Sequence, residues 1–175
     1  MSVPWQQSAG LIQINSAGNA VMRVDTTPTV QGNRRSVRIT TQQTYTGGLV
    51  IMDSVHMPTG CGTWPAFWSN GTQLLRSGIV YSVTLRRNVG PNWPAGGEID
   101  IIEGVNDYTN NQATIHTNAG CNLANTNTFT GHLVGGTNCA ALQTGNQGCG
   151  IRATETNSYG SAFNSINGGV YASQF

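Results

Sequence analysis

The stretch Gly97-Glu98-Ile99-Asp100-Ile101-Ile102-Glu103 decides the fold class, and it holds three of the seven acidic residues in this 175-residue chain. Residues two apart in a β-strand share a face, so Glu98 and Asp100 are predicted to point the same way. Glu103 departs from that alternation by one residue and joins them only if the strand carries a β-bulge. With such a bulge, the strand would present three carboxylates on one side.

Such a cluster has little structural use, because three neighbouring carboxylates repel one another. A pair of carboxylic acids on either side of a scissile bond is instead what glycoside hydrolysis requires, one as nucleophile and one as proton donor. Two other interpretations are a solvated acidic face and a calcium site. The Ile101-Ile102 spacing does not resemble a calcium loop, so no metal is expected.

The composition favours a small all-β domain. Charged residues make up 9% of the chain, lysine is absent and the net charge is +1, which gives no electrostatic basis for binding nucleic acid or a membrane surface. The 23 glycines, with many Asn, Thr and Ser residues, favour turns between short strands. No apolar run reaches the ~18 residues that a membrane span needs.

Short alternating or β-branched runs separated by turn residues predict the strands, and no window has convincing helical periodicity. The first two runs are joined by residues 15–19, which predict a hairpin connection. The predicted strands are Leu11–Ile14, Ala20–Val24, Ser36–Thr40, Gly48–Val55, Trp64–Trp68, Glu98–Glu103, Gln112–Thr117 and Gly169–Ala172.

The acidic motif, the preceding Gly62-Thr63-Trp64-Pro65-Ala66-Phe67-Trp68 and the string Trp93-Pro94-Ala95-Gly96-Gly97 resemble glycoside hydrolase family 16. The resemblance is to its fungal laminarinase-like endo-β-1,3(4)-glucanases and covers about residues 10–171. It implies an all-β fold, an antiparallel β-jelly-roll sandwich with a concave substrate cleft, and a retaining mechanism. Members of the family are longer, so the sandwich is expected to be incomplete at both ends.

The resemblance assigns Glu98 as nucleophile and Glu103 as general acid/base, with Asp100 between them. A retaining glycosidase needs these two carboxyl groups ~5–5.5 Å apart, so the bulge is a requirement of the mechanism. Asp100 is expected to hold Glu98 in place, and coupling among the acids is expected to raise one pKa.

Aromatic and polar residues near the motif are candidates for binding a glucan. Indole rings stack on the apolar faces of sugars, which makes Trp93 and Trp68 candidates, whereas Trp64 is expected in the core. His116 is expected beside the carboxylates through antiparallel pairing, as the family resemblance also suggests. Asn70 is the fourth candidate. The remaining histidines, His56 and His132, are expected to be structural, and turn chemistry accounts equally well for Asn106 and Asp107.

Four cysteines, Cys61, Cys121, Cys139 and Cys149, lie in Gly/Asn/Thr-rich sequence of the kind that secreted enzymes cross-link. Three pairings are possible, and spacing does not decide among them. We favour Cys121 with Cys139, which leaves Cys61 with Cys149. A zinc site and four free thiols are the alternatives.

The segment Thr72–Gly90 is predicted to be an atypical insertion in a single domain that spans residues 1–175. In relatives the Trp-Ser-Asn-Gly string runs almost directly into Pro-Asn-Trp-Pro, whereas here three of the eight arginines and two apolar clusters intervene. The segment is interpreted as a translated intron or other gene-model error, or else as a genuine loop over the cleft.

The sequence therefore predicts a monomeric endo-hydrolase of β-1,3- or mixed β-1,3/1,4-glucan, without a cofactor. Alternatives are a non-catalytic glucan-binding protein, an inactive fragment of the same fold and a transglycosylase. An extracellular location is expected, although residues 1–5 lack the pattern of a signal peptide.

Overall fold

Short strands make up most of the regular structure in the computed structural model, which describes residues 9–41, 43–72, 76–83, 92–124 and 128–175; of Thr72 and residues 76–83 it describes the backbone alone. Within these residues the elements are β1 (Ile12–Ile14), β2 (Ala20–Met22), β3 (Val37–Thr40), β4 (Leu49–Ser54), β5 (Pro65–Thr72), β6 (Arg76–Val83), β7 (Glu98–Glu103), β8 (Gln112–His116), β9 (His132–Val134), β10 (Cys149–Arg152), α2 (Gly160–Ser165) and β11 (Gly169–Gln174). None of the described helices is long and apolar enough to cross a membrane.

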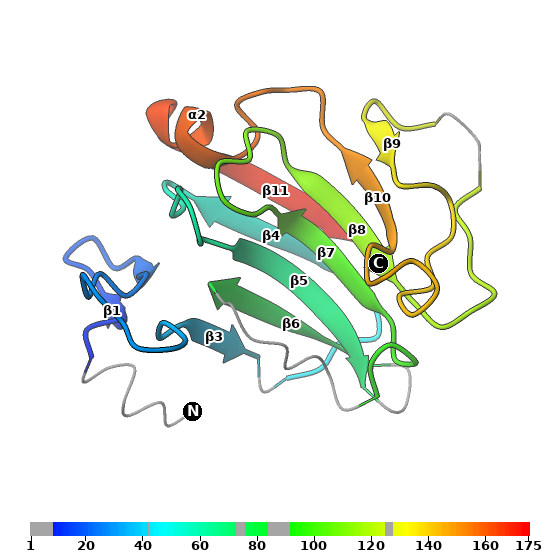
Figure 1. Cartoon of the computed structure of the whole chain (residues 1–175), viewed down its shortest axis with the longest axis horizontal. Helices are drawn as coiled ribbons and strands as arrows, with labels where there is room; N and C mark the ends of the chain where they lie inside the picture. Colours follow the sequence, from blue (N-terminus) through cyan, green and yellow to red (C-terminus); the bar gives the residue numbers. More distant parts are fainter. Residues whose placement is uncertain (1–8, 42, 73–75, 84–91, 125–127) are drawn as a thin grey trace.

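Seven strands form one antiparallel sheet in the order β3-β6-β5-β7-β8-β10-β9, and β4 pairs with β11 in a second sheet. The buried residues Phe67, Ile102, Tyr159 and Phe163 form the core with side chains from β4 and β11, among them Met52. In Figure 1 the second sheet lies behind the central strands of the first. The predicted all-β sandwich is confirmed.

The bulge that the motif predicts is present in β7, where it pairs with β5. Asp100 lies opposite Trp68 and Ile102 opposite Phe67, so Ile101 is an extra residue in β7. Ile101 and Ile102 both belong to the core, and Glu103 returns to the side of Asp100. One inserted residue therefore changes the face on which the end of the strand presents its side chains.

The eight predicted runs all contain strands, and residues 15–19 connect β1 to β2 as predicted. Asn15 stabilises this turn, because its Oδ1 accepts hydrogen bonds from the backbone N–H groups of Ala17 and Asn19 at 3.0 and 2.9 Å. The sequence did not predict β6, β9, β10 or the short helix α2.

The interpretation of Thr72–Gly90 as a loop over the cleft is wrong for its central part. Residues 76–83 form β6, which pairs with β5 on one side and β3 on the other. Residues 73–75 and 84–90 lie outside the described residues. The β-branched and aromatic run at 79–83 suits a strand, and the Arg-rich surroundings obscured that signal.

The favoured cysteine pairing is wrong. Cys139 is bonded to Cys149 with 4.4 Å between their Cα atoms, whereas Cys61 and Cys121 are free and exposed. Cys121 does lie beside Cys139, because its carbonyl accepts the Cys139 N–H at 3.0 Å. This contact involves backbone atoms, and the Cys121 thiol remains free.

Tyr159 joins the ends of β5 and β7 inside the core. Its hydroxyl lies 2.7 Å from the Pro65 carbonyl and 2.8 Å from the Gly104 carbonyl, and the side chain is almost fully buried. We expect Tyr159→Phe to lower the free energy of unfolding by about 1–3 kcal/mol, because two buried carbonyls lose their shared donor. Chemical denaturation measures this loss.

Tyr45→Phe is the matched control, because the Tyr45 hydroxyl bonds to Gln43 at the surface. We expect it to change stability by less than about 0.5 kcal/mol. Equal effects of the two substitutions would contradict the role given to Tyr159.

Candidate active site

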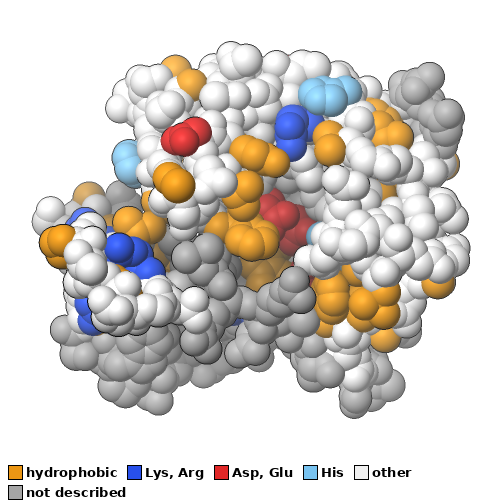
Figure 2. Space-filling model, viewed as in Figure 1, with side chains coloured by type: hydrophobic (Ala, Val, Ile, Leu, Met, Phe, Trp, Pro, Cys, Tyr) orange, Lys and Arg blue, Asp and Glu red, His pale blue; other side chains and the backbone are white. Residues whose placement is uncertain are grey.

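The three carboxylates of β7 share one face of the large sheet with side chains from both neighbouring strands. On β5, Asn70 lies opposite Glu98 and Ala66 opposite Glu103; on β8, His116 lies opposite Glu98. Figure 2 shows acidic side chains at the bottom of a hollow over the central strands, beside apolar ones. The predicted grouping of Glu98, Asp100, Glu103, His116 and Asn70 is thus present in the geometry.

Burial makes this group of acids hold protons at unusually high pH. It raises the pKa of Glu98 to about 8 and the pKa values of Asp100 and Glu103 to about 7, and repulsion from Asp100 adds to the rise at both glutamates. Asp100 is the most deeply buried, with 2% of its surface exposed. Three carboxylates with raised pKa values in one hollow are typical of a functional site.

His116 lies beside the carboxylates, as expected, and its nearest acidic contact among the described residues is Asp100. The His116 Nε2 lies 3.3 Å from the Asp100 Oδ2, a distance at which a protonated imidazole would form an ion pair, although the two atoms lack hydrogen-bond geometry. The charge of a protonated His116 would lower the pKa of Glu98 and Glu103. His116 is therefore placed to influence all three acids.

Glu103 has a partner that the sequence did not predict. The Trp64 indole N–H donates a hydrogen bond of 2.9 Å to Glu103 Oε1, and 38% of the Trp64 surface is exposed. The expectation that Trp64 is a core residue is wrong. Trp64 precedes Ala66, Trp68 and Asn70 at intervals of two, so extending the strand alternation by one step would have found it.

The other two tryptophans lie near Glu98 and Asp100. The Trp93 ring is 6.3 Å from the His116 ring, and its indole N–H is close enough to Glu98 to oppose the rise in the pKa of that acid. Trp68 is mostly buried and lies beneath Arg38, whose guanidinium carbon is 4.3 Å from the ring centre. Arg38 also lies within electrostatic reach of Glu98.

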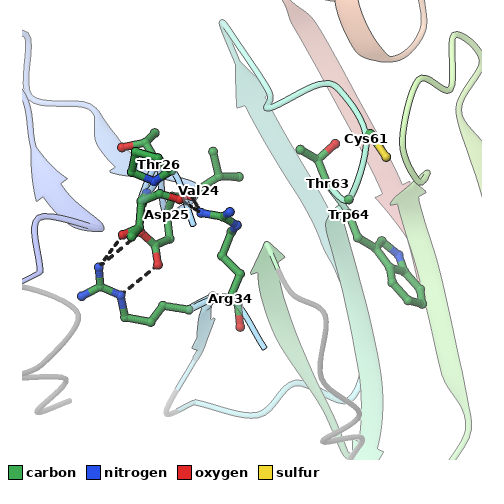
Figure 3. Close-up of a pocket in the computed structure, with 12 residues that line it drawn as sticks. Val24, Asp25, Thr26, Arg34, Cys61, Thr63 and Trp64 are labelled. Atoms are coloured by element: carbon green, nitrogen blue, oxygen red, sulfur yellow. Dashed lines mark hydrogen bonds and ion pairs between the residues drawn. The ribbon is translucent and has the colours of Figure 1, made fainter. Parts of the chain in front are cut away.

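A pocket of about 400 Å³ lies on the Trp64 side of the site (Figure 3). One wall carries Asp25, whose carboxylate Oδ2 accepts a hydrogen bond of 2.9 Å from Arg35, and the other wall is formed by residues 61–64. The Arg35 guanidinium and the Thr27 hydroxyl hold the pKa of Asp25 well below its usual range. The pocket therefore shares Trp64, the hydrogen-bond partner of Glu103, with the group of acids.

Glu98, Asp100 and His116 also form a group that could hold a metal ion. Each offers one ligand atom, and these atoms lie within 4.8 Å of one another. That the protein works without a metal ion remains a prediction.

Two antiparallel sheets packed around a common core are the architecture of the jelly-roll class, whose members include lectin domains. A family model described as "XgeA-like, catalytic GH16 domain" matches residues 4–80 and 87–175. The chain therefore belongs to glycoside hydrolase family 16. Only residues 81–86 fall between the two matched stretches, so most of Thr72–Gly90 is matched.

Three known proteins resemble the chain. A probable endo-1,3(4)-β-glucanase of Aspergillus flavus is 39% identical over 98% of this chain and 23% of its own length. Laminarinase 16A of Phanerochaete chrysosporium, solved with β-glucans in donor and acceptor sites, is 37% identical with a TM-score of 0.81, over 99% of this chain and 53% of its own. An elongating family 16 β-1,3-glucosyltransferase is 37% identical with a TM-score of 0.78, over the whole chain and 53% of its own. The chain thus spans about half the length of these solved structures, and less of the curated relative.

The raised pKa values predict that stability falls with increasing pH. Unfolded carboxyl groups titrate near pH 4, so between about pH 4 and 8 the folded protein binds more protons than the unfolded one, and its free energy of unfolding decreases as pH rises. We expect Asp100→Asn to flatten this decrease, because an amide needs no proton. Melting temperatures between pH 5 and 8 test it, above the range in which Asp25 titrates.

Asp107→Asn serves as the control, since the Asp107 side chain is exposed. It should leave the pH dependence of the melting temperature as it is in the unaltered protein. A melting temperature that rises from pH 5 to 8 in the unaltered protein would contradict the burial argument.

Proposed function

We propose that this chain acts as a retaining endo-hydrolase of β-1,3- or mixed β-1,3/1,4-glucan, with Glu98 as nucleophile and Glu103 as general acid/base. The observation that carries the proposal is the β7 bulge, which directs both glutamates to one face. On a regular strand, residues five apart would face opposite sides of the sheet. The family membership and the glucan named for the relatives support the same conclusion.

In the first step, Glu98 attacks the anomeric carbon while Glu103 gives its proton to the departing glycosidic oxygen. In the second step, Glu103 takes a proton from water, which attacks the same carbon and releases Glu98. Two inversions give net retention. Glu103 must therefore be protonated at one stage and ionised at the next.

The two glutamates compete for a proton in the empty site, since the pKa of Glu98 is raised to about 8 and that of Glu103 to about 7. The reaction uses the arrangement in which Glu98 carries the charge while Asp100 and Glu103 are protonated. The Trp93 indole N–H favours this arrangement, because it opposes the rise in the pKa of Glu98. A protonated Asp100 can then donate a hydrogen bond to Glu98.

The glucan is proposed to lie along the hollow, with Trp93, Trp68, His116 and Asn70 on the face that it contacts. Because Trp64 bonds to Glu103, the pocket beside Trp64 lies on the side where the leaving half of the chain would sit. The disulfide between Cys139 and Cys149 is consistent with an extracellular enzyme.

A second candidate is transglycosylation, in which a sugar hydroxyl replaces water in the second step. The 37% identity to an elongating β-1,3-glucosyltransferase favours it. Products longer than the substrate, formed from concentrated laminari-oligosaccharides, would distinguish this outcome from hydrolysis.

We expect Glu98→Gln to reduce turnover of laminarin by at least about 10³-fold, because the amide cannot form the glycosyl intermediate. Reducing-end release measures the loss, and circular dichroism checks the fold. Proton NMR of the first product should show the β-anomer for the unaltered protein.

Asp107→Asn removes an exposed carboxylate that is not on β7 and should keep full turnover. Substantial hydrolysis by Glu98→Gln would refute the assignment of the nucleophile. If the unaltered chain is folded and binds glucan but does not hydrolyse it, a non-catalytic glucan-binding function is favoured instead.

Trp64→Phe is expected to move the alkaline limb of the pH–rate profile upward. The indole hydrogen bond lowers the pKa of Glu103, so its loss raises that pKa and keeps the acid protonated to higher pH. The dependence of kcat/KM on pH measures the shift. A limb that stays in place or moves downward would show that Trp64 does not control the proton of Glu103.

A further inference from the structure

The ladder between β7 and β8 stops at the bulge. Regular pairs join Glu98 to His116, Ile99 to Ile115 and Asp100 to Thr114, and β7 has no further pair with β8. The extra residue Ile101 breaks the register there, so the last half of β7 needs other partners for its buried backbone groups.

The side chain of Asn111 supplies them. Its Nδ2 donates a hydrogen bond of 2.9 Å to the Ile101 carbonyl, and its Oδ1 accepts one of 3.0 Å from the Glu103 N–H. One side-chain amide thus replaces the pair of bonds that a neighbouring strand would have made around Ile102. An amide offers an acceptor and a donor in one planar group, whereas an ionised carboxylate only accepts.

Asn111 is itself fixed from the other side. Its backbone N–H donates to Ser158 Oγ at 2.9 Å, and its carbonyl accepts the Ala153 N–H at 2.8 Å. Ser158 Oγ in turn donates to the Glu155 carbonyl at 2.6 Å. With 7% of its surface exposed, Asn111 is a rigid link between the segment 153–158 and the bulge.

We infer that Asn111 is a positioning residue for Glu103: its amide holds the bulged end of β7 and thereby sets where the Glu103 carboxyl lies relative to Glu98. The inference rests on the proposed function for its chemical consequence. The side-chain amide of Asn111 bonds to the backbone on either side of Ile102, so it acts on Glu103 through that backbone.

A displaced Glu103 has a recognisable kinetic signature. It would fail to protonate a sugar leaving group, yet a 2,4-dinitrophenolate leaves without a proton, so Glu98 can still form the glycosyl intermediate. It would also fail to deprotonate water, whereas azide attacks the anomeric carbon as an anion, forms a C–N bond and releases Glu98 with no base. A general loss of folded protein would instead lower both reactions together.

The test compares Asn111→Ala and Asn111→Asp with the unaltered chain on laminarin and on 2,4-dinitrophenyl β-laminaribioside, with and without azide. We expect about 10²-fold slower turnover of laminarin. On the aryl substrate we expect formation of the intermediate to change only a few-fold, azide to accelerate turnover, and β-laminaribiosyl azide to appear. Glu103→Ala is the reference for this pattern.

Asn110→Ala is the matched control, because Asn110 bonds to Ala153 and Thr109 and not to β7. It should behave as the unaltered protein. Labelling with a 2-deoxy-2-fluoro laminaribiosyl fluoride, followed by intact mass, counts the competent sites and corrects each rate for folded protein.

The inference is overturned if the Asn111 variants hydrolyse laminarin at the unaltered rate per competent site, or if both substrates slow equally with no effect of azide. Amide hydrogen exchange by NMR tests the contact without turnover. In Asn111→Ala the Glu103 amide should exchange at least about tenfold faster while the Ile99 amide stays protected. Unchanged exchange at Glu103 also overturns the inference, and an unaltered chain that neither labels nor cleaves glucan refutes the proposed function instead.

Discussion

One extra residue in β7 determines which side chains of that strand face the candidate active site and which enter the core. Without the bulge at Ile101, the pleat would direct Glu103 into the core beside Phe67 and would leave Ile102 on the acidic face. With it, both isoleucines enter the core and all three acids share one surface. The same insertion breaks the ladder to β8, which is why Asn111 has to satisfy backbone groups that a regular strand would have paired.

The acidic face is unfavourable for stability, and the rest of the chain shows how a protein with so few charges tolerates it. The acids are buried enough to retain protons near neutral pH, so the sheet does not hold three full negative charges in one hollow. Partial relief comes from His116, Trp64 and Trp93, which belong to three different parts of the chain. The three carboxyl groups of β7 cost stability, and neighbouring side chains reduce that cost. Such a locally unfavourable cluster is typical of a functional site.

The sequence was sufficient where a local rule governs the structure. Strand alternation predicted the shared face of Glu98 and Asp100, and the position of Glu103 predicted the bulge. It failed where the outcome depends on the path of the chain in three dimensions. The bond between Cys139 and Cys149 depends on how the segment before β10 turns back onto the start of that strand, and the contact of Trp64 with Glu103 depends on the register between β5 and β7.

The β6 segment illustrates a different failure. Its composition contrasts with the Asn-, Gly- and Trp-rich sequence around it. The interpretation from the sequence relied on that contrast and overlooked the β-branched and aromatic residues that favour a strand. Pairing on both sides shows why a strand is required there, since without β6 the edge strand β3 would have no partner in the sheet. β3 carries Arg38, which lies over Trp68 at the centre of the hollow. The β6 segment therefore connects β3, which carries Arg38, to β5, the neighbour of the strand β7 that bears the acids.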